Sequence, residues 1–160
     1  MEQAPVGIVV VDMEGIVIDI NATALQILGS PGRDVSLGLN VLTLPALVES
    51  GVSDLFYQVL ANDEPIELET EYTSRWGRRA YLRTRLAPRF DTRGKQIGVI
   101  QFLEDVSERK RIELALELNR ERYAMAAEAA QVGVWDWDLV TNEFYLDPTI
   151  KAMLGYTDEE

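Results

Sequence analysis

Residues 66–105 read IELETEYTSRWGRRAYLRTRLAPRFDTRGKQIGVIQFLED, and this stretch decides the fold. On both sides of a turn at 75–77, apolar or threonine side chains alternate with charged ones, as they do in strands that bury one face. A second turn at 91–94 leads into a further apolar run, KQIGVIQFLED. The pattern predicts three consecutive antiparallel strands joined by short turns.

The polar faces of the first two strands carry opposite charges. Glu67, Glu69 and Glu71 occupy one strand, and Arg83 and Arg85 occupy the next. A register slip of one residue would turn all of these side chains into the core. We therefore predict that Glu69 or Glu71 lies opposite Arg83. Because an exposed ion pair contributes only a few tenths of a kcal/mol, we interpret the ladder as a device for register and solubility rather than for ligand binding.

The first fifty residues add a second hairpin and short helices. The segment VGIVVVDMEGIVIDIN holds two β-branched runs, 7–12 and 16–21, around a turn where Gly15 can adopt a positive φ. Asn21 is placed to cap a short helix that ends at Gly29. The serine, proline and glycine residues between 30 and 51 predict loops and short helical turns.

One longer helix is expected in SDLFYQVLAND, residues 53–63. Ser53 is the expected cap, and Leu55, Val59 and Leu60 share one face at helical spacing. The order of elements predicts an α+β fold, with a five-stranded antiparallel sheet that carries helices on one face.

Composition excludes several classes of function. The 160-residue chain has no cysteine and no histidine, so disulfides, thiolate metal sites and histidine chemistry are absent. The formal net charge of −12 disfavours direct contact with nucleic acid or an anionic membrane. The run VGIVVV is too short to span a bilayer, and MEQAP lacks the basic residues of a signal peptide. We expect a cytoplasmic location, although the parent protein could be membrane-anchored.

The two ends of the first hundred residues resemble a known family. EQAPVGIVVVDMEGIVIDIN, followed by ALQILG, resembles the opening of a PAS domain, and RWGRRAYLRTRLAPRFDTRGKQIGVIQFLEDVSERKR resembles its closing hairpin and PAC-type exit motif. The resemblance covers residues 1–106. It implies a sensory or regulatory input module of a multi-domain signal-transduction protein, either a sensor histidine kinase in a two-component phosphorelay or a cyclic-dinucleotide enzyme.

A second, incomplete match begins at residue 132. VGVWDWDLVTNEFYLDPTIKAMLGYTDEE resembles the start of another PAS domain, with a first strand, a turn, a second strand and a first helix. The expected organisation is therefore a PAS domain at 1–106, a helical linker at 107–131, and the N-terminal fragment of a second PAS domain at 132–160.

The exit from the last strand is the expected site of signal transmission. Asp105 closes the strand, and Ser107 is expected to cap a helix whose first turn carries Glu108 near the positive end of the helix dipole. With only Val106 between them, a shift of the strand must move the helix. In the PAS family the exit passes the state of the domain to the next module, and the resemblance gives this role to Asp105, Val106 and Ser107, where the family usually has Asp-Ile-Thr.

The linker carries the spacing of a parallel coiled coil. Its steps alternate between four and three residues, and the seam consists of Ile112, Leu116, Asn119, Tyr123, Ala126 and Ala130. A buried Asn119 would fix the register of two strands. We expect a parallel homodimer, with adjacent domains of the parent chain as the other partners. The alternatives are a helix that lies against its own domain, or an accidental repeat.

No cofactor is expected, and the resemblance narrows the choice. Histidine-ligated haem and cysteinyl-flavin are excluded because the chain lacks both residue types. Non-covalent flavin, with Trp76, Trp135 or Trp137 as neighbours, and a small metabolite stay open as ligands. The simplest expectation is a pocket that is filled by leucine, valine and phenylalanine side chains.

An enzymatic role for this chain is not expected. It has no phosphate-binding Gly-Lys-Ser/Thr loop and no histidine to accept a phosphoryl group. Asp136 and Asp138 alternate with tryptophans, which indicates the polar face of a strand rather than an acid–base pair. Catalysis would belong to the parent protein. Two alternatives to the input module are a redox sensor that binds flavin or a small ligand, and a stand-alone protein-interaction domain.

Overall fold

The computed structural model describes residues 6–130 and 134–155, with side chains up to residue 126 in the helix that ends at Ala130. The chain divides into two compact units, Met1–Lys110 and Arg111–Glu160, and each is described by itself.

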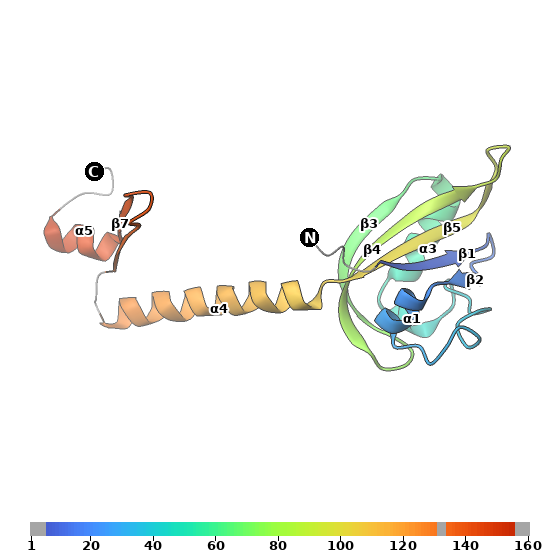
Figure 1. The fold of residues 1–160 in the computed structure, drawn as a ribbon, viewed down its shortest axis with the longest axis horizontal. Helices are drawn as coiled ribbons and strands as arrows, with labels where there is room; N and C mark the ends of the chain where they lie inside the picture. Colours follow the sequence, from blue (N-terminus) through green and yellow to red (C-terminus); the bar gives the residue numbers. More distant parts are fainter. Residues whose placement is uncertain (1–5, 131–133, 156–160) are drawn as a thin grey trace. The chain divides into compact units, whose positions relative to one another are not determined.

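The first unit is built on a five-stranded antiparallel sheet (Figure 1). Its strands are β1 (Gly7–Val11), β2 (Val17–Ile20), β3 (Ile66–Thr73), β4 (Arg79–Phe90) and β5 (Gln96–Asp105). They lie in the order β2-β1-β5-β4-β3, so β5, the last strand of this sheet along the chain, pairs with β1, the first one. The predicted α+β fold with a five-stranded antiparallel sheet is confirmed.

Three helices connect the two parts of the sheet: α1 (Ala22–Leu28), α2 (Pro45–Glu49) and α3 (Val52–Asn62). Asn21 caps α1 as predicted, because its side chain accepts a hydrogen bond from the Ala24 amide. Gly29 ends this helix with a φ of 65°. The short α2 lies in the segment where turns and loops were expected.

Ser53 is not the cap of α3, and this prediction was wrong. The helix starts at Val52, two residues before the start that a Ser53 cap would give, and it follows Gly51, which has a φ of 74°. Ser53 therefore lies inside the first turn, where its buried hydroxyl donates to the carbonyl oxygen of Val41 at 2.8 Å. The hydroxyl bonds to the Val41 carbonyl, in the loop before the helix, and does not act as a cap for the amides of its own helix.

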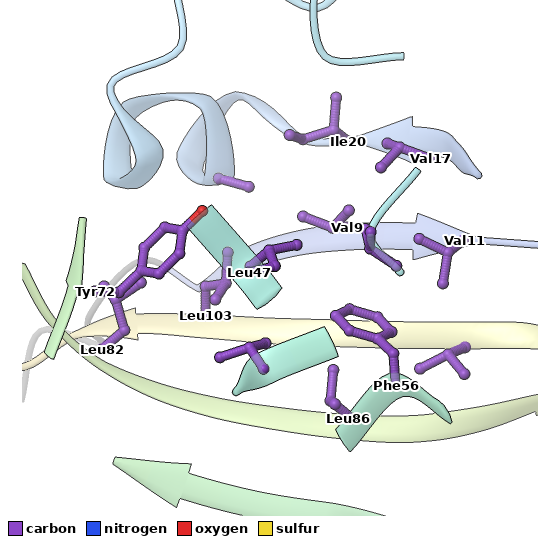
Figure 2. Close-up of a cluster of buried hydrophobic side chains, with 14 of the residues drawn as sticks. Val9, Val11, Val17, Ile20, Leu47, Phe56, Tyr72, Leu82, Leu86 and Leu103 are labelled. Carbon is purple, nitrogen blue, oxygen red and sulfur yellow. The ribbon is translucent and has the colours of Figure 1, made fainter. Parts of the chain in front are cut away.

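The core lies between one face of the sheet and the helices (Figure 2). Phe56 of α3 and Leu86 of β4 are fully buried there, together with Val11 of β1. Val59 is buried as well, and the half-buried Leu55 and Leu60 pack against the same cluster. The expected apolar face of α3 is thus the face that packs on the sheet.

The predicted register of the β3–β4 hairpin is confirmed. Glu69 lies opposite Arg83, as the alternation requires. The ion pairs run diagonally rather than straight across: Arg83 donates to Glu67 at 2.6 Å, and Arg79 pairs with Glu71. Glu69 is thereby left for other partners, which belong to the site described below.

The second unit contains most of the long helix α4 (Ser107–Ala130), which begins in the first unit. It is followed by the antiparallel strands β6 (Trp135–Trp137) and β7 (Phe144–Leu146) and by the helix α5 (Pro148–Leu154). Asp147 caps α5 by accepting from the Ile150 amide at 2.8 Å. The order of strand, strand and helix agrees with the expected start of a second domain, and the three domain boundaries stay a prediction.

Two general features complete the fold. In the part of the chain that the structure describes, no helix is both long and apolar enough to cross a membrane. Within the same residues, no cluster of three or more acidic side chains is arranged to hold a metal ion.

Candidate functional site: the exit from the sheet

The junction between sheet and linker is as short as the sequence predicts. β5 ends at Asp105 and α4 begins at Ser107, so Val106 alone separates them. Val106 is 6% exposed, and its N–H donates to the carbonyl oxygen of Tyr81 in β4 at 2.9 Å. Its own carbonyl oxygen accepts the bond from the Lys110 amide at 2.9 Å, so it takes part in both the sheet and the helix.

The Ser107 hydroxyl does not bond to the amides of its own helix as a cap would, and the first amide of α4 bonds to the Asp105 carboxylate. Oδ1 of Asp105 accepts a hydrogen bond from the Ser107 amide at 3.0 Å. The Ser107 hydroxyl accepts from the Tyr81 amide at 2.9 Å and so binds the helix to β4. Because Ser107 is already the first helical residue, its side chain reaches the neighbouring strand more readily than the amides of its own helix.

Arg78 holds the second oxygen of Asp105. Its Nη2 lies 3.2 Å from Oδ2 of Asp105, and its Nη1 donates to the carbonyl oxygen of Gln26 at 2.6 Å. Partial burial raises the pKa of Asp105, but the hydrogen bonds from Ser107 and the bond and charge of Arg78 outweigh it and hold the pKa below its ordinary value. One guanidinium therefore joins the last turn of α1 to the exit.

Glu69 holds the first turn of α4 from β3, which is an edge strand of the sheet. Its carboxylate accepts from Nη2 of Arg109 at 2.5 Å and lies 3.4 Å from Nζ of Lys110. Desolvation raises the pKa of Glu69, but the hydrogen bonds and charges of Arg109 and Lys110 outweigh it, so the net pKa is lowered. The start of the helix is therefore bonded to both β3 and β4.

The structure brings Asp105, Val106 and Ser107 together as the sequence predicts, and it adds residues that sequence reasoning missed. These are Arg78 and Glu69, together with the backbone of Tyr81. Two sequence signals could have indicated the pairing of Glu69: the alternation places it on the polar face of its strand, and the basic residues 109–110 directly follow the exit. Nothing in the sequence connects Arg78 to Gln26, which is 52 residues away.

The proposed seam of the linker is exposed in the single chain. Its side chains from Ile112 to Ala126 are all exposed, and that of Ala130 lies outside the described residues. Leu116 in the seam and Leu114 outside it are equally exposed, at 53% each. Exposed apolar side chains thus occur on more than one face of α4, and the seam stays a prediction.

A cavity of about 60 Å³ lies inside the first unit, next to the core. Its wall is mostly aliphatic, and Arg75 and Trp76 of the β3–β4 turn also line it. The Arg75 guanidinium lies 5.7 Å from the centroid of the Trp76 ring. Trp76 is therefore the only one of the three tryptophans considered for a ligand that lines this cavity, because Trp135 and Trp137 are exposed on β6 in the second unit.

Comparison with known proteins agrees with this geometry. A family model described as "PAS fold" matches residues 1–111. The PAS domain of BvgS from Bordetella pertussis is 26% identical with a TM-score of 0.54, and the match covers 72% of this chain and 88% of that one. The PAS domain of the histidine kinase ThkA is 25% identical with a TM-score of 0.51, and the match covers 62% of this chain and 98% of that one.

A curated relative extends the similarity beyond the first unit. The probable diguanylate cyclase DgcE of Escherichia coli (strain K12) is 26% identical over 148 residues, which are 92% of this chain. The chain spans only 13% of the length of that relative.

Proposed function

Because residues 1–111 belong to the PAS fold family, we propose that this chain is the sensory input part of a multi-domain signalling protein. In this proposal the first unit takes up a signal, and the exit at Asp105, Val106 and Ser107 passes it to α4. The parent would be a sensor histidine kinase or a cyclic-dinucleotide enzyme. The similarity to a probable diguanylate cyclase and to a PAS domain of a histidine kinase supports these two classes of parent.

The observation that carries the proposal is the set of bonds around the junction. Val106 and Ser107 are each bonded to Tyr81 of β4, and Glu69 of β3 pairs with Arg109 and Lys110. A flexible connection would absorb a small movement of the strands, whereas a bonded first turn has to follow it. The junction therefore suits the transmission of a shift in the sheet.

The β3–β4 turn offers a route from the cavity to this junction. Arg75 and Trp76 line the cavity, and Arg78, at the end of the same turn, holds Asp105 and the Gln26 carbonyl. A molecule that displaces the Trp76 side of the turn would change the position of Arg78. This observation favours the second candidate function, a sensor that responds to a small ligand.

The linker would act in a parallel homodimer, with the seam from Ile112 to Ala130 facing its twin. Isolated helices of this length are marginal in water, so an exposed α4 gains stability from a partner helix. Charges at the flanks of the seam would fix the pairing, and Asn119 would set its register.

Analytical ultracentrifugation tests the dimer. Leu116→Glu should shift the chain toward the monomer, because it places a charge in the seam. Leu114→Glu, which changes an equally exposed leucine outside the seam, is the matched control and should leave the association unchanged. Asn119→Leu should tighten the association. A chain that sediments as a monomer before and after the Asn119 change contradicts the dimer.

A further inference from the structure

The β4–β5 hairpin projects beyond the strands on either side of it (Figure 1). β3 begins at Ile66, opposite Leu86, and β1 ends at Val11, opposite Val99. Residues 89–95, which read RFDTRGK, are therefore flanked only by the two arms of the hairpin itself, and we call them the hairpin tip. At about 3.3 Å per residue, the tip extends roughly 10 Å past the end of β1.

The hairpin tip carries three cations and one acid. Arg93 and Lys95 are exposed and Arg89 is partly exposed, and none of the three forms an ion pair within the described part of the chain. Oδ1 of Asp91 accepts from the amides of Arg93 at 2.8 Å and Lys95 at 2.9 Å, so this carboxylate shapes the turn rather than pairing with a cation. Three positive charges and one negative charge leave the tip at +2, in a chain of net charge −12.

Arg89 has a hydrogen-bond donor that the chain does not use. Its Nε is the one buried side-chain polar atom without a partner among the described residues. Folded proteins pair nearly all of their buried polar groups, so the guanidinium of Arg89 lacks an acceptor. Phosphates and carboxylates suit this role, because each accepts from two N–H groups of one guanidinium at the same time. The missing acceptor is therefore an oxyanion.

The ring of Phe90 decides between a lipid surface and a protein as the source of this oxyanion. Phe90 lies next to Arg89 and is 46% exposed. Segments that bind at the surface of a membrane combine basic side chains, which contact anionic headgroups, with a large apolar side chain that enters the headgroup region. An acidic protein segment would instead have to wrap around the projecting turn to bury the ring. The hairpin tip therefore favours the lipid surface.

The acidic remainder of the chain restricts this contact to the tip. Glu14 in the β1–β2 turn and Glu64 before β3 are exposed at the same end of the sheet, and both would be repelled by an anionic surface. At physiological ionic strength, charges in solvent are largely screened beyond about 8 Å. Because the tip extends farther than this past β1, its own cations dominate the potential that a surface meets there.

We propose that the hairpin tip is a docking site for an anionic lipid surface. Phe90 enters the headgroup region, Arg93 and Lys95 contact headgroup phosphates, and Arg89 takes a phosphate as its missing acceptor. Each basic residue near such a surface strengthens binding about fivefold, so three of them give a reversible contact rather than a stable anchor. The proposal concerns the first unit alone and does not depend on transmission through α4.

Flotation of the whole chain with lipid vesicles tests the proposal. Vesicles of phosphatidylcholine with about 40% phosphatidylglycerol should carry the chain at about 0.05 M salt and release it at about 0.5 M salt. Vesicles of phosphatidylcholine alone should not carry it. A chain that floats with neither kind of vesicle, or equally with both, overturns the proposal. Sedimentation of the same chain without vesicles reports the α4 dimer, so the two proposals fail independently.

Two soluble probes separate the lipid surface from other oxyanions. Inorganic phosphate supplies the anion of the headgroup without the surface, and polyglutamate supplies the carboxylates of an acidic protein. Shifts of the Arg93 and Lys95 amides in two-dimensional NMR report the binding of each probe. At equal anion concentration and ionic strength, the vesicles should bind more tightly than either probe. Tighter binding of phosphate or of polyglutamate overturns the lipid surface as the partner.

Paired variants test whether the tip makes the contact. Arg93→Ala together with Lys95→Ala should weaken flotation with the anionic vesicles about 25-fold, which is about fivefold for each cation. Arg120→Ala together with Arg122→Ala removes the same charge from exposed positions on α4, and it should change flotation by less than about threefold. Equal losses in the two double variants overturn the proposal. Phe90→Ala should weaken flotation at least about fivefold.

Spin labels locate the contact, because the chain has no cysteine of its own. Thr92→Cys places a label at the exposed tip, and Gln58→Cys places the matched control on the exposed face of α3. On anionic vesicles, the label at residue 92 should lose its contact with a water-soluble relaxation agent, whereas the label at residue 58 should keep it. Equal accessibility of the two labels on the vesicles, or protection of residue 58 alone, contradicts docking through the tip.

Discussion

Arg78 lies 3.2 Å from Asp105, and the same guanidinium donates to the carbonyl oxygen of Gln26 at 2.6 Å. One side chain thereby joins the end of α1, the β3–β4 turn and the exit of the sheet. Lysine could not replace it, because a single ammonium does not present two donors in a planar fork. The relationship gives the exit a mechanical connection to a helix that is far away in the sequence.

Arg78→Ala should lower the free energy of unfolding by about 1 kcal/mol, because it breaks a partly exposed ion pair and frees a carbonyl at the end of α1. Urea denaturation measures the change. Arg93→Ala, in the exposed β4–β5 turn, is the matched control and should have almost no effect. Equal losses in the two variants would show that the bridge contributes nothing to stability. Arg78→Lys should recover less than half of the loss.

The lowered pKa of Asp105 predicts a pH dependence of stability. Its ionised form is favoured in the folded chain, so the contribution is present above the unfolded pKa of about 3.9 and is lost as the pH falls through the lower folded value. Asp105→Asn should therefore be less stable than the original chain at neutral pH. The difference should shrink as the pH falls from about 5 toward about 2.

Urea denaturation across this pH range measures the effect. The same substitution in an Arg78→Ala background should have a smaller effect at neutral pH, since one of the groups that stabilise the carboxylate is already gone. A difference between Asp105→Asn and the original chain that stays constant with pH would refute the linkage.

Ser107 should act through its bond to β4 rather than as a helix cap. Ser107→Ala removes the acceptor of the Tyr81 amide, which should then exchange its hydrogen with solvent faster, at a cost in stability of about 1 kcal/mol. Ser107→Thr keeps the hydroxyl and should preserve the protection of this amide. Hydrogen exchange followed by NMR reads the Tyr81 amide directly. Faster exchange confined to the first amides of α4 would instead indicate a capping role.

Much of the fold could be predicted because it follows from periodicity. The alternation in residues 66–86 fixes which side chains face the core, and so the pairing of Glu69 with Arg83. Asn21 could be recognised as a cap and Gly29 as a helix end because both act on their immediate neighbours. The position of the exit could also be predicted from local signals, because Asp105 ends the apolar strand and Ser107 begins the polar helix two residues later.

The parts that could not be predicted depend on contacts between distant residues. Ser53 and Ser107 look like caps, but each hydroxyl bonds to a distant backbone group that only the tertiary structure brings near. A shift of one residue in the start of α4, and of two residues in the start of α3, decides the outcome. Arg78 could not be assigned for the same reason, since both of its partners lie on other elements. The cavity depends on how three strands and the helices pack together.

Gly98 tests the packing of β5 against β1. Its φ is 145°, and a Cβ built there would lie 2.0 Å from the carbonyl oxygen of Val11, so backbone must move to admit a side chain. Gly98→Ala should destabilise the chain by about 3 kcal/mol or more, as measured by urea denaturation. Gly32→Ala is the control: it has no atom within 4 Å of the new Cβ and an ordinary φ, and it should change stability by less than about 1 kcal/mol. Similar stabilities of the two variants would contradict the close approach of β5 to Val11.

Because β5 leads directly into Asp105, Gly98→Ala should also speed hydrogen exchange at the Val106 amide, whereas Gly32→Ala should not.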